Sequence, residues 1–324
     1  MVVDARTDIR KSVAEAVEIL KSRSLVALPT ETVYGLAGDA LELEAVTKIF
    51  EVKERPRFDP LIIHLAGKEW LARLAYLPGD TKPLLEKLMA RFWPGPLTIL
   101  LPKTDLVPDL VTAGLDDVAI RVPRHPVFVE VLRAFGRPVA APSANRFGRV
   151  SPTLSEHVFD ELNGRIPLIL DAGPTTVGLE STIIRVEANG IAILRQGAVS
   201  EESLAEIAPT RELPTSQEIL APGQTASHYA PDKLVHLFDP QHVTSQCENA
   251  ALICWGPIHH AAHFSVVRSL SETRDMCEAA QSLFSLLREM AQLSVERIFV
   301  EPVPEIGLGK AIMNRVRRAA AARK

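Results

Sequence analysis

Three basic residues, Lys53, Arg55 and Arg57, lie within five positions of the sequence, directly before an apolar segment that carries His64. Pro56 cannot continue a preceding helix and forces the residue before it into an extended conformation, so the pattern predicts a rigid turn that displays the cations. Cations gathered in this way favour the binding of a polyanion such as a phosphate chain. A solvated surface turn is the competing interpretation.

Two further arginines lie inside segments with the pattern of strands. Alternate residues of a strand face the same side, so Arg121 faces away from the aliphatic side chains of 118–122. Arg195 follows Ile191 and Ile193 at the same period of two. An arginine in such a place needs an anion, either a ligand or a neighbouring carboxylate. Together with the basic turn, these arginines predict one convergent anion site.

Small and hydroxylic residues fill another segment, VAAPSANRFGRVSPT. Its apolar start predicts a strand, and the side chains of Ser143, Asn145 and Ser151 offer hydrogen bonds to a phosphate or a sugar. Thr153 and Glu156 have the spacing of a capping box, which predicts the start of a helix. The chain has neither a Walker A loop nor a GxGxxG fingerprint, so a nucleotide held here requires another scheme.

Hydroxyls and a carboxylate also recur at two expected strand ends, in Pro29–Thr32 and Gly178–Thr182. Ligands of open α/β sheets bind at such ends. Helix caps and turns are the alternative role for these side chains. No Ser-His-Asp order and no GxSxG elbow is present, which argues against covalent catalysis.

Composition predicts a soluble globular protein with one large or two ordinary domains. The chain has 324 residues, of which 47% are hydrophobic and 23% charged, and its formal net charge is −4. This charge argues against non-specific coating of nucleic acid, although the basic last fifteen residues allow a contact with RNA. Charged residues near the N-terminus argue against a signal peptide, and no apolar run is long enough to span a bilayer. We therefore expect a cytoplasmic protein without membrane contact.

Neither cysteines nor histidines predict a metal site. Cys247, Cys254 and Cys277 lack CxxC spacing and are interpreted as reduced thiols in core or neutral positions. Three histidines lie between residues 259 and 263, but no carboxylate or thiol completes the usual ligand spacing around them.

The elements expected to position these residues form a mixed α/β domain over residues 1–212. A helix is expected behind Thr7 as its cap, a second one over 42–52, and a loop at TETVYGLAGDA. Asn189-Gly190 predicts a tight hairpin. Strands are predicted at 25–28, 61–65, 97–101, 118–122, 139–141, 166–170, 182–187 and 191–196. Such a mixture predicts a sheet with both parallel and antiparallel pairs.

A linker is predicted at 213–233, because this proline-rich stretch has little periodicity. A structureless connection of this length suggests a function, so the His228-Tyr229 pair within it is a candidate. A smaller α/β domain follows at 234–324. Its expected strands are 234–238, 251–255 and 297–300, and its expected helices are 273–293 and 310–323.

Seven motifs of the chain resemble, in order, the YrdC family: ALPTETVYGLAGDA, KERPRFDPLIIH, FWPGPLT, AIRVPRHP, PVAAPSANRFGRVSPT, GLESTI and ILRQGA. APGQTASHYAP resembles the interdomain linker of the family's long form, and GLGKAIMNRVRRAA resembles its additional domain. The resemblance implies a YrdC-like mixed twisted sheet with helices, followed by a smaller Rossmann-like α/β domain.

The long form of this family is the threonylcarbamoyl-AMP synthase. The resemblance implies a reaction of L-threonine, bicarbonate and ATP that yields threonylcarbamoyl-adenylate and pyrophosphate. It implies partners in the machinery that transfers the threonylcarbamoyl group to tRNA. It implies Mg²⁺ carried with ATP, no resident metal and no organic cofactor. This chemistry requires no protein nucleophile, in line with the missing catalytic triad.

The resemblance also assigns roles to residues, with Lys53 and Arg55 as the catalytic pair on the phosphates. It implies ATP contacts at Lys53, Arg55, Asp59, Asp117, Ser143, Asn145, Ser151, Arg195 and Tyr229. It implies threonine contacts at Thr32, His64, Arg121, Ala141 and Ser181, with Arg121 on the threonine carboxylate. Asp59 departs from the family, which commonly has Asn there, and a carboxylate beside phosphates needs a metal or an arginine to offset it.

Two other classes of function fit parts of the pattern. A basic concave surface could seat a double-stranded RNA backbone, which would make the protein an RNA- or tRNA-binding module. A carbamoyl-transfer module, like the YrdC-like part of hydrogenase maturation factors, would turn over carbamoyl phosphate. The chain lacks the other modules of those factors.

Overall fold

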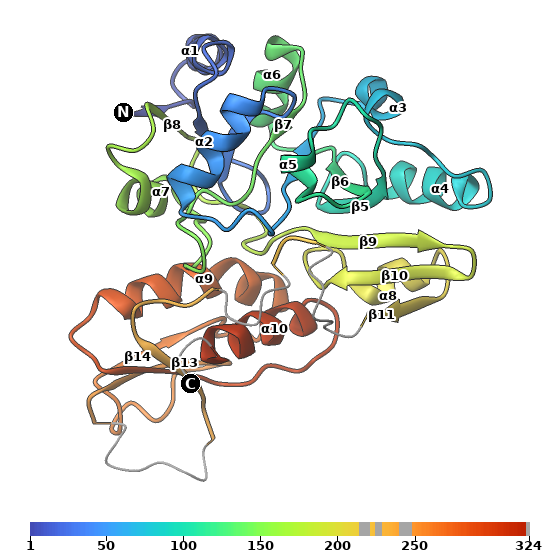
Figure 1. The fold of residues 1–324 in the computed structure, drawn as a ribbon. Helices are drawn as coiled ribbons and strands as arrows, with labels where there is room; N and C mark the ends of the chain where they lie inside the picture. Colours follow the sequence, from blue (N-terminus) through green and yellow to red (C-terminus); the bar gives the residue numbers. More distant parts are fainter. Residues whose placement is uncertain (214–220, 224–228, 240–247, 322–324) are drawn as a thin grey trace.

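The structure, a computed structural model, describes residues 1–213, 221–223, 229–239 and 248–321. Within these ranges the chain forms a larger unit that begins at the N-terminus and a smaller one that contains the C-terminal helix (Figure 1). The strands of the larger unit end at Glu212, and those of the smaller unit begin at Leu234. None of the helices described is long and apolar enough to cross a membrane.

Eleven strands of the described larger unit pair in the order β1-β8-β2-β3-β7-β4-β6-β5-β9-β10-β11. They span Val2–Asp4 (β1), Val26–Leu28 (β2), Gly35–Asp39 (β3), Ile62–His64 (β4), Leu97–Pro102 (β5), Asp117–Arg121 (β6), Val139–Ala140 (β7), Leu168–Asp171 (β8), Thr182–Glu187 (β9), Gly190–Arg195 (β10) and Thr210–Glu212 (β11). Strand β4 is parallel to β6, whereas β5 is antiparallel to β6. The predicted mixed sheet is confirmed, and so is the hairpin of β9 and β10, but its two connecting residues are Ala188 and Asn189, and Gly190 already pairs with Glu187.

Helices of the larger unit pack their apolar faces on this sheet. They span Ile9–Lys21 (α1), Leu43–Lys53 (α2), Leu71–Leu74 (α3), Lys82–Phe92 (α4), Asp109–Thr112 (α5), Pro126–Phe135 (α6), Ser155–Leu162 (α7) and Glu201–Ala205 (α8). Helices α1 and α6 pack together, and with α2 they lie on the side remote from the smaller unit (Figure 1). Apolar residues at a period near 3.6 produce these buried faces.

Two expected helix caps are wrong. The cap of α1 is Asp8, whose carboxylate accepts a hydrogen bond from the Lys11 amide at 3.0 Å; Thr7 lies one residue too early. Helix α7 has no side-chain cap. The Thr153 hydroxyl instead lies 2.8 Å from the Ser285 hydroxyl of the smaller unit, so Thr153 forms a contact between the two units and does not cap the helix.

Strand β3 occupies a segment that the sequence predicts as a loop. Its residues, GLAGD, have no β-branched side chain, but the strand pairs with β2 and β7 in the centre of the sheet. A Cβ atom at Gly38 would lie 2.7 Å from Leu25 Cδ2 and 3.3 Å from Ile49 Cδ1 of α2. The glycine therefore allows the helix to approach the strand closely, and tertiary packing overrides the loop-forming composition.

The smaller unit is a parallel sheet in the order β12-β15-β13-β14. Its elements span Leu234–Leu237 (β12), Ala250–Cys254 (β13), Val266–Ser269 (β14), Met276–Gln292 (α9), Arg297–Val300 (β15) and Leu308–Ala321 (α10). The predicted α/β class is confirmed, although the sequence does not reveal β14. The short strands β1 and β11 also escape sequence prediction, because three residues show no usable alternation.

A shared apolar core joins the two units. Val33, Val150 and Leu179 of the larger unit belong to one buried cluster with residues of α9 and α10. At Gly178 the backbone has φ +78°, and a Cβ atom would lie 2.4 Å from the Cα of Gln281 in α9. Only glycine permits this approach of loop and helix.

Candidate active site

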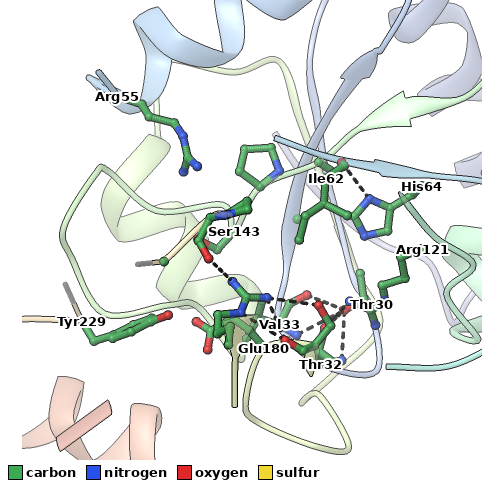
Figure 2. Close-up of a pocket in the computed structure, with 17 residues that line it drawn as sticks. Thr30, Thr32, Val33, Arg55, Ile62, His64, Arg121, Ser143, Glu180 and Tyr229 are labelled. Carbon is green, nitrogen blue, oxygen red and sulfur yellow. Dashed lines mark hydrogen bonds between the residues drawn. The ribbon is translucent and has the colours of Figure 1, made fainter. Parts of the chain in front are cut away.

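Most residues that the sequence assigns to a site line one pocket of the larger unit. The pocket has a volume of about 550 Å³, which includes the open space at its entrance. It lies between the ends of several strands and the described residues of the linker (Figure 2). Nine of the fourteen assigned residues line it: Thr32, Arg55, His64, Arg121, Ala141, Ser143, Ser181, Arg195 and Tyr229. Arg55 of the basic turn, the two strand arginines and residues of the hydroxylic segments therefore meet at one pocket.

The ends of parallel strands set the positions of two key side chains. His64 ends β4 and Arg121 ends β6, and the register of these strands places the two residues side by side. Arg195 ends β10 and reaches the same pocket. These are the carboxyl ends of the strands, where open α/β sheets bind ligands.

The guanidinium group of Arg121 is buried and held from several sides. It forms an ion pair with Glu31 at 2.7 Å and donates hydrogen bonds to the Thr32 hydroxyl at 2.9 Å and the Gly95 carbonyl at 3.1 Å. Burial raises the pKa of Glu31, but the charge and hydrogen bond of Arg121 outweigh it, so the pKa is lowered. Glu31 is not predicted from the sequence as a site residue, although it lies in Pro29–Thr32, one of the two strand-end segments identified there as candidate ligand sites.

His64 is a neutral, buried imidazole. Its Nδ1 lies 3.3 Å from the Ile62 carbonyl, which can only accept, so Nδ1 carries the proton and Nε2 is left as an acceptor. Burial, together with the neighbouring charge of Arg121, lowers the pKa of His64 well below its usual value. The ring also packs on Phe128 at a centroid distance of 5.3 Å.

Arg195 connects the strand end to the linker. It donates to the Ser181 carbonyl at 2.9 Å, to the Ser181 hydroxyl at 3.1 Å and to the Pro222 carbonyl at 3.1 Å. Burial lowers its pKa to about 10, a value at which the group is still charged at neutral pH. Arg195 thus holds the described linker residues 221–223 over the pocket.

Arg55 and Asp59 form a buried pair at the edge of the same pocket. Their charged groups lie 2.9 Å apart, and the guanidinium also donates to the Asp59 carbonyl at 3.1 Å and the Pro60 carbonyl at 2.7 Å. Burial raises the pKa of Asp59 against the opposing charges of Arg55, Lys53 and Arg195. The charge of Asp59 is therefore offset by Arg55.

Five assigned residues do not line the pocket: Lys53, Asp59, Asp117, Asn145 and Ser151. The ammonium group of Lys53 donates to the carbonyls of Ser143 and Asn145, because α2 ends with this residue directed into the loop after β7. Burial lowers its pKa well below the usual value. Lys53 thus supports the loop from behind.

Asp117 lies at the other end of β6 from Arg121, about 13 Å away at 3.3 Å per residue of strand. Its carboxylate pairs with Arg185 at 2.6 Å. The structure does not bring it to the pocket. The side-chain amide of Asn145 donates to the carbonyls of Arg146 and Arg149 at 2.8 and 3.0 Å, so this residue shapes the loop.

A buried network reaches the pocket from the smaller unit. The Ser151 hydroxyl donates to Glu180 at 2.6 Å, and Arg315 of α10 pairs with the other oxygen of Glu180 at 3.0 Å. Arg315 is fully buried, and its guanidinium carbon lies 5.1 Å from the ring centroid of Tyr229. Tyr229 lines the pocket and stacks on Phe284 of α9. His228 lies outside the described residues.

Sequence reasoning missed Glu180 and Arg315 as site residues. Glu180 belongs to the Gly178–Thr182 segment, so a signal existed. Arg315 has none, because its role depends on the docking of the smaller unit.

Two family models together match nearly the whole chain. A model of the Sua5, YciO and YrdC proteins, described as "Telomere recombination", matches residues 18–197. A second, described as "Threonylcarbamoyl-AMP synthase, C-terminal domain", matches residues 199–321. The chain belongs to the Sua5/YciO/YrdC family.

Relatives of the two-domain form are similar over almost their full length. Threonylcarbamoyl-AMP synthase of Bacillus subtilis is 37% identical over 96% of this chain and 93% of the relative. The enzyme of Pyrococcus abyssi is 38% identical over 94% of this chain and 92% of the relative. The crystal structure of Pyrococcus abyssi Sua5 complexed with L-threonine matches 96% of this chain and 94% of that chain with a TM-score of 0.89. The protein has the two-domain Sua5 form.

In this Sua5/YciO/YrdC family member, the His64 ring should remain neutral at pH values at which an exposed histidine is already protonated, which an NMR titration of its ring would measure. Because the folded-state pKa lies below the unfolded value of about 6.5, the unfolded chain binds the proton first. The free energy of unfolding should therefore fall below about pH 6.5, by up to about 1.4 kcal/mol per pH unit, and His64→Gln should remove this contribution. A ring that titrates near pH 6.5 would contradict the assignment.

Arg315→Met should lower the free energy of unfolding by about 3–5 kcal/mol, because Glu180 would remain buried without its partner. Arg317→Met is the matched control: it lies on the same helix, and its exposed pair with Glu305 contributes under about 1 kcal/mol. Urea denaturation measures both. The double variant Glu180→Gln/Arg315→Met should regain part of the free energy of unfolding that Arg315→Met loses. If Arg315→Met and Arg317→Met lower the free energy of unfolding equally, the stabilising role of the buried pair is refuted.

Proposed function

We propose that this protein is a threonylcarbamoyl-AMP synthase that joins L-threonine, bicarbonate and ATP, releases pyrophosphate and supplies the modification of tRNA. The observation that carries the proposal is the full-length likeness to the Sua5 complexed with L-threonine. The pocket supports it independently, because Arg55, Arg121 and Arg195 converge there and the described lining residues include no activated nucleophile.

The reaction fits a pocket of this kind. Carbon dioxide from bicarbonate adds to the threonine amine, and the resulting N-carboxylate attacks the α-phosphorus of ATP. The P–O bond to the β-phosphate breaks, and pyrophosphate leaves with the negative charge. The protein then contributes orientation of the two substrates and stabilisation of charge on the phosphates by fixed cations.

We assign threonine to the end of the pocket formed by β4 and β6. Arg121 has the planar donor geometry that suits the threonine carboxylate. The Nε2 atom of neutral His64 is an acceptor for the threonine hydroxyl or amine. Thr32 and Ser181 supply hydroxyls beside these groups, and Ala141 leaves space at the backbone.

We assign the phosphates to the end formed by Arg55, Ser143 and Arg195. Lys53 contributes through the loop that it holds, because its two hydrogen bonds fix the carbonyls of Ser143 and Asn145. Ser151 acts through Glu180, which lines the pocket.

Mg²⁺ enters as part of the ATP substrate in this proposal. Among the described pocket residues and their partners, the carboxylates of Glu31, Asp59 and Glu180 each pair with an arginine. These carboxylates are committed to structure, so the phosphate oxygens hold the ion.

The linker acts as a lid in this mechanism. Pro222, Gly223 and Tyr229 line the pocket, and Tyr229 is buried against Phe284 of the smaller unit. Both the carbamate and the mixed anhydride react with water, so a covered pocket protects the intermediate and the product. The adenylate passes to a tRNA threonylcarbamoyl transferase, which places the protein in the cytoplasm with that machinery.

The purified protein should form pyrophosphate and an acid-labile adenylate only when ATP, threonine and bicarbonate are all present. Radiolabelled threonine followed by thin-layer chromatography measures the adenylate directly. Turnover of carbamoyl phosphate in its place would favour carbamoyl transfer. RNA binding with a steep salt dependence, unaffected by ATP and threonine, would favour an RNA-binding module.

Lys53→Ala and Arg55→Ala should each lower the rate of adenylate formation by about tenfold or more. Arg55→Ala removes a cation of the phosphate end, and Lys53→Ala releases the loop that carries Ser143. Arg57→Ala is the matched control, because Arg57 belongs to the same turn but is exposed, and its rate should stay within about twofold. Unfolding midpoints separate loss of the site from loss of the fold. Folded Lys53 and Arg55 variants with unchanged rates would refute the phosphate assignment.

A further inference from the structure

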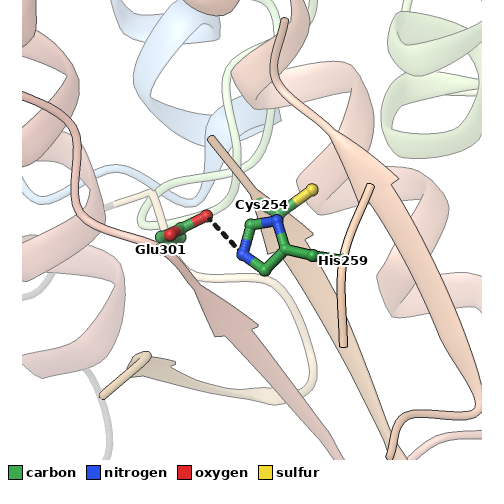
Figure 3. Close-up of side chains that lie close together, drawn as sticks. All are labelled: Cys254, His259 and Glu301. Atoms are coloured by element: carbon green, nitrogen blue, oxygen red, sulfur yellow. Dashed lines mark ion pairs between the residues drawn. The ribbon is translucent and has the colours of Figure 1, made fainter. Parts of the chain in front are cut away.

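The smaller unit carries a cluster of potential metal ligands that is separate from the pocket. Cys254, His259 and Glu301 place a thiol, an imidazole nitrogen and a carboxylate oxygen within 4.8 Å of one another (Figure 3). None of the three lines the pocket described above.

Topology brings the three residues together. Cys254 ends β13 and Glu301 directly follows β15, and these strands are parallel neighbours in the centre of the small sheet. After β13 the chain turns to β14 on one side, whereas after β15 it enters α10, which packs near β12 on the other side. The connections diverge between the two strands, and such a switch point is where open α/β sheets bind ligands.

Hydrogen bonds fix the direction of the histidine and the carboxylate. Nδ1 of His259 lies 2.8 Å from the Pro257 carbonyl, which can only accept, so this nitrogen carries a proton and Nε2 faces Glu301 at 3.4 Å. The Glu301 oxygen also accepts a hydrogen bond from the Trp255 amide at 2.6 Å. A histidine oriented by a carbonyl through its other nitrogen is the usual arrangement of a metal-binding imidazole.

The sulfur of Cys254, Nε2 of His259 and an oxygen of Glu301 meet at one place, and all three are atom types that bind metal ions. The thiol also donates a hydrogen bond to the Gly256 carbonyl at 3.8 Å, which metal binding would replace. The thiol of Cys254 is buried at the same place. One metal ion at this place would contact all three groups.

We propose that Cys254, His259 and Glu301 bind a Zn²⁺-class transition-metal ion. Thiolate, imidazole and carboxylate together are a zinc donor set, and three protein ligands leave a fourth position for water or another donor. Bond lengths of about 2.0–2.3 Å place tetrahedral ligand atoms about 3.3–3.8 Å apart, so the His259–Glu301 pair at 3.4 Å already fits and the thiol lies within 4.8 Å of both. The ion would cross-link the two central strands and the loop of His259, and so stabilise this unit.

The full-length protein, stripped of metal with a chelator, should bind one equivalent of Zn²⁺ in competition with a chromogenic chelator. Co²⁺ in place of Zn²⁺ should give a thiolate charge-transfer absorption. Cys254→Ser should abolish this band, and His259→Ala and Glu301→Gln should each weaken Zn²⁺ binding at least about tenfold. Cys277→Ser and His263→Ala, which change exposed residues of the same unit, are the matched controls and should bind normally.

Three results would overturn the proposal. They are no stoichiometric Zn²⁺ binding, a Co²⁺-loaded protein without the thiolate band, or undiminished binding by Cys254→Ser. The first two use the unaltered chain, so they decide the question even if a variant fails to fold. Any of the three would leave His259 and Glu301 as an ion pair only.

Discussion

The burial of several guanidinium groups in one pocket is the constraint on which the rest of this structure depends. An ion removed from water costs several kcal/mol unless a partner compensates it. Glu31 and Asp59 compensate Arg121 and Arg55, and backbone carbonyls compensate Arg195. Because these partners come from separate segments of the chain, the sheet, the basic turn and the linker must all be in place together. Cations ordered in this way need little reorganisation when an anionic substrate arrives.

The same constraint gives the smaller unit its part in the site. Glu180 lies at the pocket, but its cation, Arg315, is supplied by α10. The pair forms only when the smaller unit is docked, and Gly178 and Val150 provide the close apolar contact that holds it there. Tyr229 lies between these layers, with Phe284 and Arg315 against its ring. The second unit therefore completes the charge balance of the first and supplies the surface on which Tyr229 packs.

Sequence reasoning succeeds where one local rule determines the outcome. Alternation along a strand is sufficient to predict that Arg121 faces away from the apolar side of its strand. Most of the residues to which the motif resemblance gives a role line one pocket. It fails where tertiary contacts decide. Strand β3 forms because β2 and β7 pair with it, and Gly38 leaves the space that α2 needs. Lys53 points to backbone carbonyls because α2 ends against the loop. Asp117 shares a strand with Arg121, yet strand length separates their side chains.

The cluster of potential metal ligands in the smaller unit, Cys254, His259 and Glu301, could not be predicted from sequence spacing at all. Spacing rules for metal sites describe ligands that come from one loop or one helix. Here the thiol and the carboxylate follow two strands that are adjacent in space, and the helix α9 separates them in sequence. The histidines at 259–263 are visible as a group, but the partners of His259 become visible only when the order β15-β13 is known. Strand order is thus the information that turns three unrelated residues into one candidate site.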